Sequence, residues 1–236
     1  MSVIAIIPAA GIGQRMGQEI PKQYLPLLGK TILELSVYAL LADPRVSQVY
    51  IGLQPNDSYF PNLALAKDPR IVPVTGGESR AETVTNALLE AAKKHTSHTL
   101  VAVHDAARPG LSKVLLAKLL DSAEDQPNQG VLAAVPAWDT MKRKQSTLAP
   151  LITIDRTELW HAFTPQIFQL GPLLKALQHA EDKGLQVTDE ASAMEQQGLS
   201  PVLVHAEQQL RKITCPEDLI MVEALMLAAQ QKINME

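Results

Sequence analysis

Cysteine and long apolar segments are nearly missing from this sequence. Its one cysteine, Cys215, cannot form a disulfide bond within the chain, so we expect a reducing, cytoplasmic compartment. No apolar run approaches the roughly 18–20 residues that a membrane-spanning helix needs, so we expect no membrane partner. The apolar segment 1–8 is shorter than a secretory signal and lacks a basic start, and we interpret it as a buried strand.

An excess of charge of either sign is also lacking. The chain has 21 Lys and Arg residues against 25 Asp and Glu, which gives a formal net charge of −4. A general nucleic-acid binder would need a basic excess, and an aromatic content of 4% leaves few side chains for stacking on bases. We therefore expect no nucleic-acid partner. A hydrophobic content of 46% is ordinary for a globular protein, and 236 residues suit one large α/β domain or two small ones.

Short β-branched runs alternate with helical patterns along most of the chain. The helical patterns repeat apolar residues at one face of a helix, as Leu33, Val37 and Leu40 do. This alternation predicts one three-layer, doubly wound α/β domain over residues 1–236, with a mostly parallel sheet and ligands at the carboxyl ends of its strands. Strands are expected at 3–7, 46–53, 71–75, 100–104, 131–135 and 202–205, and helices around 33–41, 84–91, 116–123, 172–183, after 188, and 216–231.

The alternation stops between Ala137 and His161. This segment is polar, contains Pro150 and has no helical period, and it is too long for an ordinary loop. We interpret it as an extended β-hairpin arm, which is either functional or reaches another subunit.

A loop of small residues follows the first expected strand, from Pro8 to Gly17. Small residues let the backbone approach a ligand closely, and successive amides in such a turn form a concavity that binds anions. Arg15 and Lys22 add two cations, and we expect both on an exposed loop. Cations held over a triphosphate stabilise the charge that builds on the α-phosphate during in-line attack, which implies nucleotidyl transfer with pyrophosphate leaving. A glycine-rich turn with solvated charges is the structural alternative.

Two familiar phosphate motifs do not fit this region. A dinucleotide-binding turn needs a helix to start at once and a charged residue at the end of the second strand. Here Pro21 interrupts the segment, and the second strand ends at the uncharged residues 52–54. A P-loop ending at Gly29 would need a glycine where Tyr24 stands.

Short motifs occur in a distinctive order along the whole chain. They are Pro8-Ala9-Ala10-Gly11-x-Gly13-x-Arg15-Met16, Pro21-Lys22-Gln23-Tyr24, Gly76-Gly77-Glu78-x-Arg80, His104-Asp105-Ala106-Ala107-Arg108-Pro109, Asp139-Thr140-Met141-Lys142, Thr164-Pro165-Gln166, Thr188-Asp189-Glu190-Ala191-Ser192 and Lys212-Ile213-Thr214. In this order they resemble the 2-C-methyl-D-erythritol 4-phosphate cytidylyltransferases of the non-mevalonate isoprenoid pathway. The first motif is shared with many nucleotidyltransferases, whereas the ordered set is very specific.

The resemblance implies transfer of CMP from CTP to 2-C-methyl-D-erythritol 4-phosphate, in a homodimer with exchanged arms. On the nucleotide side it assigns Arg15 and Lys22 to the transition state at the α-phosphate. The loop amides would cradle the triphosphate, and the residues after Gly76 would hold the cytosine and its ribose. The residues that it assigns to CTP are Pro8, Ala9, Ala10, Gly11, Gly13, Gly77, Glu78, Arg80, Thr83 and Ala106.

On the acceptor side, the resemblance implies that Arg156 and Lys212 hold and align the attacking phosphate. It assigns Asp105 to substrate hydroxyls and to the metal–nucleotide region. The substrate-binding residues that it implies are Asp105, Arg108, Thr140, Thr164 and Thr188. Because no acidic cluster is spaced like a protein metal cage, we expect Mg²⁺ as a cofactor held mostly by the triphosphate.

Several of these residues have a structural alternative. Asp105 at a strand end could be a buried hydrogen-bond acceptor, Arg156 a solvated charge, and Thr188 a helix N-cap followed by acidic residues. The histidines show no metal-ligand spacing, and we interpret them and Cys215 as structural.

Two other functions compete with the leading one. The first is a cytidylyltransferase for another alditol or sugar phosphate, against which residues 139–142 with Arg156 favour the methylerythritol acceptor. The second is a non-catalytic sensor of CTP. Retention of Arg15, Lys22 and Lys212 together favours catalysis, because binding alone does not need a complete transition-state set.

Overall fold

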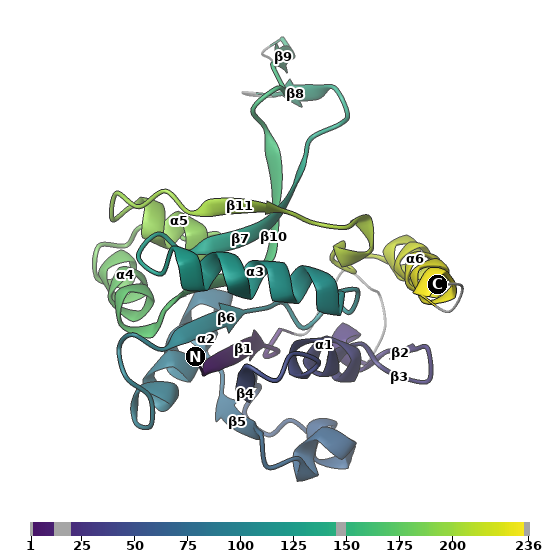
Figure 1. Ribbon diagram of the computed structural model, residues 1–236, viewed down its shortest axis with the longest axis vertical. Coiled ribbons are helices and arrows are strands. Elements are labelled where there is room, and N and C mark those ends of the chain that lie inside the picture. The colour runs from purple at the N-terminus through teal and green to yellow at the C-terminus, as the bar shows by residue number, and fades with distance from the viewer. Residues whose placement is uncertain (1, 12–19, 145–149, 234–236) are drawn as a thin grey trace.

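A seven-stranded, mostly parallel sheet forms the centre of the molecule (Figure 1). The computed structural model describes residues 2–11, 20–144 and 150–233. The strand order is β11-β7-β10-β6-β1-β4-β5, and β10 alone runs antiparallel to its two neighbours. The strands are β1 (Val3–Pro8), β4 (Val46–Leu53), β5 (Ile71–Thr75), β6 (Leu100–Val103), β7 (Val131–Pro136), β10 (Trp160–Gln169) and β11 (Val202–His205).

Helices cover both faces of this sheet, so the expected three-layer α/β architecture is confirmed. The helices are α1 (Ile32–Leu41), α2 (Arg80–Ala92), α3 (Lys113–Asp125), α4 (Leu170–Asp182), α5 (Glu190–Glu195) and α6 (Pro216–Ile233). Within the described residues, none of them is long and apolar enough to cross a membrane. Shorter elements are the 3-10 turns η2 (Lys22–Tyr24), η3 (Phe60–Asn62), η4 (Ala64–Lys67) and η5 (Gln208–Leu210), and the strands β2 (Pro26–Leu27) and β3 (Lys30–Thr31).

The first strand shows why the chain folds in layers. Successive side chains of a strand point to opposite faces, and every residue of β1 before Pro8 is fully buried. Val3, Ala5 and Ile7 pack with α1 and α3, whereas Ile4 and Ile6 pack with α2 and α4. An uninterrupted apolar run therefore marks a strand covered on both faces.

Strand β10 was not expected from the sequence. Its second half pairs with β6, but its register against β7 shifts between Ala162 and Gln166, around Pro165. A proline inside a run argues against a central strand, because it donates no ladder hydrogen bond. The strand tolerates it at this irregular step.

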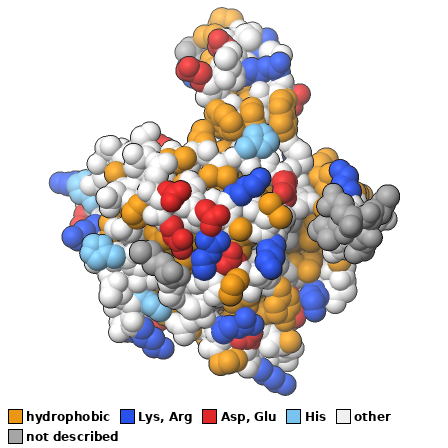
Figure 2. Space-filling view, viewed as in Figure 1, with side chains coloured by type: hydrophobic (Ala, Val, Ile, Leu, Met, Phe, Trp, Pro, Cys, Tyr) orange, Lys and Arg blue, Asp and Glu red, His pale blue; other side chains and the backbone are white. Residues whose placement is uncertain are grey.

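The described residues of segment 137–161, which are 137–144 and 150–161, form the expected hairpin arm. It leaves the body between β7 and β10, and β8 (Met141–Arg143) pairs antiparallel with β9 (Ile152–Ile154) at its outer end (Figure 1). Trp138 is 53% exposed, and Leu151 and Ile152 are exposed as well. Figure 2 shows hydrophobic side chains gathered where the arm leaves the body. The arm thus presents apolar surface that its own chain does not cover.

Candidate active site

A cavity of about 270 Å³ opens where β1 and β6 end and α2 begins. The expected nucleotide residues that the structure describes lie around it, together with Asp105 and Lys212. Gly13 and Arg15, which we also expected here, fall outside the described residues. The cavity is lined by Pro8, Ala9, Ala10, Gly11, Lys22, Gln23, Gly77, Glu78, Ser79, Arg80, Thr83, Asp105, Ala106, Ala107 and Lys212.

The small-residue loop is tied to the sheet and to the turn η2. The Ala9 amide donates to the Gly52 carbonyl at 2.7 Å, which continues the pairing of β1 with β4. The Gln23 side-chain amide donates to the Ala9 carbonyl at 2.8 Å and to the Gly11 carbonyl at 3.1 Å. The described residues of the loop, 9–11, therefore have a defined path along the cavity wall.

Lys22 lies in η2 and is half-buried, so the expectation of an exposed loop is wrong for this residue. Its Nζ donates to the Ile213 carbonyl at 3.1 Å. Lys22 and Lys212 thus line the same cavity. Two ammonium groups at one wall favour an anionic ligand.

The segment before α2 forms the opposite wall. Ser79 caps the helix by accepting a hydrogen bond from the Glu82 amide, which places Arg80 at the first helical position. Thr83 is buried; its hydroxyl accepts from the Gly77 amide at 3.0 Å and donates to the Ser79 carbonyl at 2.8 Å. The Thr83 hydroxyl therefore holds the segment 77–79 in place. This is the segment that we expected to lie against the cytosine base.

A buried carboxylate with three cations lies at the centre of the site. Asp105 follows β6, and its oxygens contact Arg80 Nε at 3.1 Å, Arg108 Nε at 3.1 Å and Lys212 Nζ at 3.0 Å. Burial alone would raise the pKa of Asp105, but the charges of Arg80, Lys212 and Arg108 outweigh burial and hold that pKa well below its ordinary value. Asp105 is therefore an anion that gathers cations.

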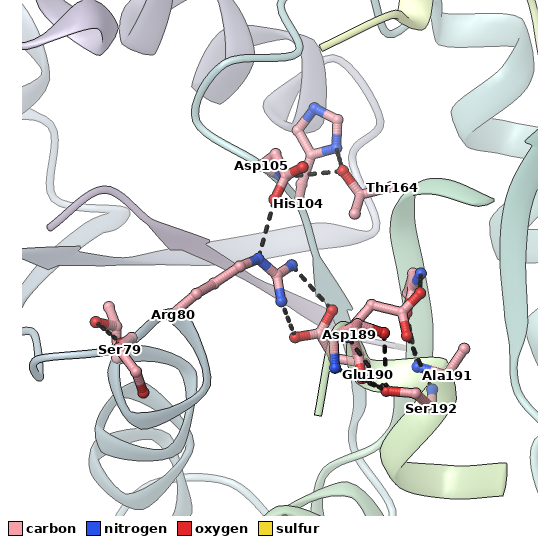
Figure 3. Close-up of polar contacts among 12 residues, drawn as sticks. Ser79, Arg80, His104, Asp105, Thr164, Asp189, Glu190, Ala191 and Ser192 are labelled. Carbon is pink, nitrogen blue, oxygen red and sulfur yellow. Dashed lines mark hydrogen bonds and ion pairs between the residues drawn. The ribbon is translucent and has the colours of Figure 1, made fainter. Parts of the chain in front are cut away.

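Arg80 connects this carboxylate to a second one. Its two terminal nitrogens contact Glu190 at 2.7 and 3.0 Å in a two-pronged pair, and Glu190 is 1% exposed (Figure 3). Burial opposes the charged form of Arg80, but Glu190 and Asp105 outweigh it and raise its pKa. Arg80 is thus fixed from both sides.

His104 and Thr164 support Asp105 from beneath. The Thr164 hydroxyl accepts from the Asp105 amide at 3.0 Å and contacts His104 Nδ1 at 3.1 Å (Figure 3). Because His104 Nε2 faces the Arg108 carbonyl at 3.0 Å, Nε2 carries the proton and Nδ1 accepts from Thr164. Burial lowers the pKa of His104 to about 4, so the ring is neutral at pH 7.

A second cavity of about 190 Å³ meets the first at Asp105, Arg80 and Lys212. Its lining includes every acceptor residue that we expected on the body of the chain. Thr140 and Arg156, which we also expected, are not part of it, because both are exposed on the arm. It is lined by Arg80, Asp105, Arg108, Ala162, Thr164, Gln166, Thr188, Asp189 and Lys212.

The structure also shows that the helix beside the acceptor cavity has a different N-cap from the one that we considered in the sequence. Asp189, rather than Thr188, is the N-cap of α5, and its side chain forms a capping box with Ser192. Gln166 donates to Asp189 at 2.8 Å and accepts from the Ala191 amide at 2.8 Å. Thr188 is therefore left beside the cavity as a lining residue.

Three residues of the site were missed as site residues in the sequence. Gln23 and Gln166 shape the cavity walls, and Glu190 fixes Arg80. All three stand inside or beside the quoted motifs, but a glutamine in a motif does not indicate what it bonds. Pairing of Glu190 with Arg80 joins residues 110 positions apart, which no local pattern reveals.

Together, a mostly parallel α/β sheet, a small-residue loop beside lysines and an adjoining second cavity are the features of a nucleotidyltransferase. The model of one family, IspD, 2-C-methyl-D-erythritol 4-phosphate cytidylyltransferase, matches residues 3–228. The chain belongs to this family.

Individual relatives agree with this assignment along nearly their whole length. A 2-C-methyl-D-erythritol 4-phosphate cytidylyltransferase of Vibrio atlanticus is 46% identical over 94% of this chain and 94% of the relative. One of Citrobacter koseri is 47% identical over 94% and 95%. The crystal structure of the Francisella tularensis protein of that name is 34% identical, with a TM-score of 0.80 over 95% of this chain and 99% of that one.

Proposed function

We propose that this chain transfers CMP from CTP to 2-C-methyl-D-erythritol 4-phosphate, giving 4-diphosphocytidyl-2-C-methyl-D-erythritol and pyrophosphate. The observation that carries the proposal is the meeting of two cavities at Asp105, Arg80 and Lys212. One cavity has the loop and lysines suited to a triphosphate, and the other has hydroxyl and cationic side chains suited to a phosphorylated polyol. Two bound substrates react only when their reacting groups are held close together, and two cavities that share a wall bring them together in this way.

Lys22, which lines the nucleotide cavity, and Arg15, which lies outside the described residues, would stabilise the charge that builds on the α-phosphate. The acceptor phosphate oxygen attacks the α-phosphorus in line, and the bond from that phosphorus to the pyrophosphate oxygen breaks. The triphosphate lies along Pro8, Ala9, Ala10 and Gly11, and the resemblance adds Gly13, which lies outside the described residues. The cytosine and ribose lie against Gly77, Glu78, Arg80, Thr83 and Ala106.

In the acceptor cavity, Lys212 neutralises the attacking phosphate and reduces repulsion between the two anions. Asp105, Thr164 and Thr188 bind the hydroxyl end of the acceptor. Arg108 is held by Asp105, by the Leu210 carbonyl at 3.0 Å, and against the Phe163 ring. It therefore lines the cavity as a fixed cation.

We propose that Mg²⁺ enters with the nucleotide. Within the described ranges, no group of three or more His, Cys, Asp or Glu side chains lies close enough to hold a metal. Both Asp105 oxygens already face cations, so in this arrangement the ion fits as a ligand of the triphosphate, with Asp105 among the protein carboxylates that line the same cavity. When bound, the ion neutralises phosphate charge.

We further propose one nucleotidyltransferase domain over 1–236 that forms a homodimer through its arms, 137–161. Thr140 and Arg156 lie on an arm that projects away from the body of its own chain (Figure 1). Exposed Trp138 and Leu151 on the same arm would be covered by a partner. In a two-fold dimer, each arm then brings Thr140 and Arg156 to the acceptor cavity of the other chain. The single cysteine supports a cytoplasmic location.

The test is release of pyrophosphate from nucleoside triphosphates with a panel of alditol phosphates, in the presence of Mg²⁺. We expect product with CTP and 2-C-methyl-D-erythritol 4-phosphate, and far less with UTP, ATP or GTP. Faster turnover with another alditol phosphate would assign a different acceptor. Binding of CTP without pyrophosphate release under any combination would identify a sensor.

A further inference from the structure

Gln23 is a buried side chain that bonds to the backbone of the small-residue loop. It is 3% exposed, and its amide nitrogen lies 2.8 Å from the Ala9 carbonyl and 3.1 Å from the Gly11 carbonyl. Both partners are carbonyl oxygens, which only accept hydrogen bonds. The nitrogen of Gln23 must therefore face them, and both of its hydrogens are used.

The bond to Ala9 determines which way the peptide between Ala9 and Ala10 points. In a trans peptide, the carbonyl and the following N–H point in opposite directions. Because the Ala9 carbonyl turns toward Gln23, the Ala10 N–H turns away from it. Ala10 and Gly11 line the cavity, and within the described part of the chain neither amide donates to a protein acceptor.

The same short turn carries a cation of the site. Lys22 precedes Gln23 in η2 and lines the cavity, and Tyr24 fixes the turn by donating its hydroxyl to Asp57 at 2.7 Å. Gln23 thus links the loop amides to the position of Lys22. Amide N–H groups and an ammonium group on one wall are complementary to phosphate oxygens.

We propose that Gln23 is a positioning residue that turns the Ala10 amide toward the triphosphate of the nucleotide. This inference rests on the proposed function and adds to it a side chain that does not itself touch the substrate. Its prediction is specific: loss of Gln23 weakens binding of the phosphate chain and leaves binding of the nucleoside unchanged.

The test compares Gln23→Met with the wild-type chain by calorimetry, using inorganic triphosphate with Mg²⁺ and, separately, cytidine. Methionine keeps the volume and removes both donors. We expect triphosphate affinity to fall about 10-fold or more, since both hydrogen bonds that hold the loop carbonyls are lost, while cytidine affinity stays within about twofold. Gln48→Met, the same change in β4 beside Tyr50, is the matched control and should leave both affinities unchanged.

A second variant keeps the inference testable if Gln23→Met does not fold. In Gln23→Glu, a buried carboxyl faces two acceptors, which raises its pKa and favours the protonated form that donates one bond. Relative to wild type at each pH, triphosphate binding by Gln23→Glu should be stronger at pH 6 than at pH 9.

Triphosphate binding by Gln23→Met within twofold of wild type, or a flat pH ratio for Gln23→Glu, would overturn the role of Gln23. Failure of the proposed function has a different signature. The wild-type chain would then bind triphosphate in a Gln23-dependent way but release no pyrophosphate from CTP and the acceptor.

Discussion

The nucleotide cavity and the acceptor cavity differ in how completely one chain builds them. The described part of the nucleotide cavity draws its walls from the end of β1, the turn η2 and the start of α2, all packed on one sheet. The acceptor cavity takes its walls from β10 and the start of α5, while the remaining acceptor residues, Thr140 and Arg156, stand on the arm. One cavity is a property of the fold, and in the homodimer that we propose the other is completed by a second chain.

The largest expected effect tests the self-contained cavity. Lys22→Ala removes one fixed charge beside the reacting phosphate, and turnover should fall about 10²–10³-fold; Arg15→Ala should behave alike. Pyrophosphate release measures the loss, and thermal melting monitors the fold. Lys67→Ala, an exposed lysine in η4, is the control and should keep full turnover. Normal turnover in Lys22→Ala would show that the first cavity is not where the nucleotide reacts.

The next experiment tests whether the acceptor cavity is shared between chains. Arg156→Ala and Lys22→Ala homodimers should each be nearly inactive, since every site lacks one group. After random subunit exchange about half of the dimers are mixed, and one of the two sites in each mixed dimer regains both groups. Activity should therefore return to roughly a quarter of wild type. If activity stays absent after exchange is verified by mass, Arg156 serves its own chain and the comparison fails.

A third prediction concerns the wall that both cavities share. Glu190→Gln removes the charge that pairs with Arg80 and leaves that arginine with Asp105 alone, so the free energy of unfolding should fall by about 3 kcal/mol. Urea denaturation at pH 7 measures it. Asp121→Asn is the control: it also loses an arginine partner at 2.6 Å, but its side chain is 66% exposed, and the change should stay below about 0.5 kcal/mol. Equal losses of unfolding free energy in the two variants would mean that the pair of Arg80 and Glu190 stabilises the protein no more than an exposed surface ion pair does.

The smallest effect is a pH dependence from His104. Its folded-state pKa of about 4 lies below the ordinary value near 6.5, so below pH 6.5 the unfolded chain takes up a proton that the folded chain does not. Stability should therefore fall as the pH falls, by about 2 kcal/mol between pH 7 and pH 5 from this residue. Urea denaturation of wild type and His104→Asn at both pH values isolates the contribution. A variant with the wild-type slope would show that His104 is not held neutral beneath Asp105.

The elements around the nucleotide cavity were easier to predict from the sequence than those around the acceptor cavity. The difference lies in the strands that carry the residues of each cavity. The runs at 3–7 and 46–53 are buried on both faces, so their apolar patterns alone identify them as strands. The small-residue loop and Lys22 follow directly from the first run. Strand β10 was missed because Pro165, with the polar residues Thr164 and Gln166 on either side, interrupts the apolar run and conceals a central strand.

Side-chain partners were harder to predict than positions. Asp105 and Arg80 were placed in the site by their motifs, but the pairing of Arg80 with Glu190 depends on how α2 and α5 pack. Lys22 was expected to be exposed because nothing near it in the sequence indicates that the Ile213 carbonyl lies within reach. Interactions of this kind become predictable only after the tertiary arrangement is known.

The base of the arm has a consequence for protein engineering. The Ala137 amide donates to the Leu159 carbonyl at 2.9 Å, so the two ends of the excursion are already neighbours, and a two-residue Asn-Gly turn is the usual way to join strands at that separation. The arm is therefore an insertion between β7 and β10, which pair with each other without it. A shortened chain with that turn would keep the sheet and the nucleotide cavity as a minimal scaffold, onto which a different acceptor-binding hairpin can be grafted.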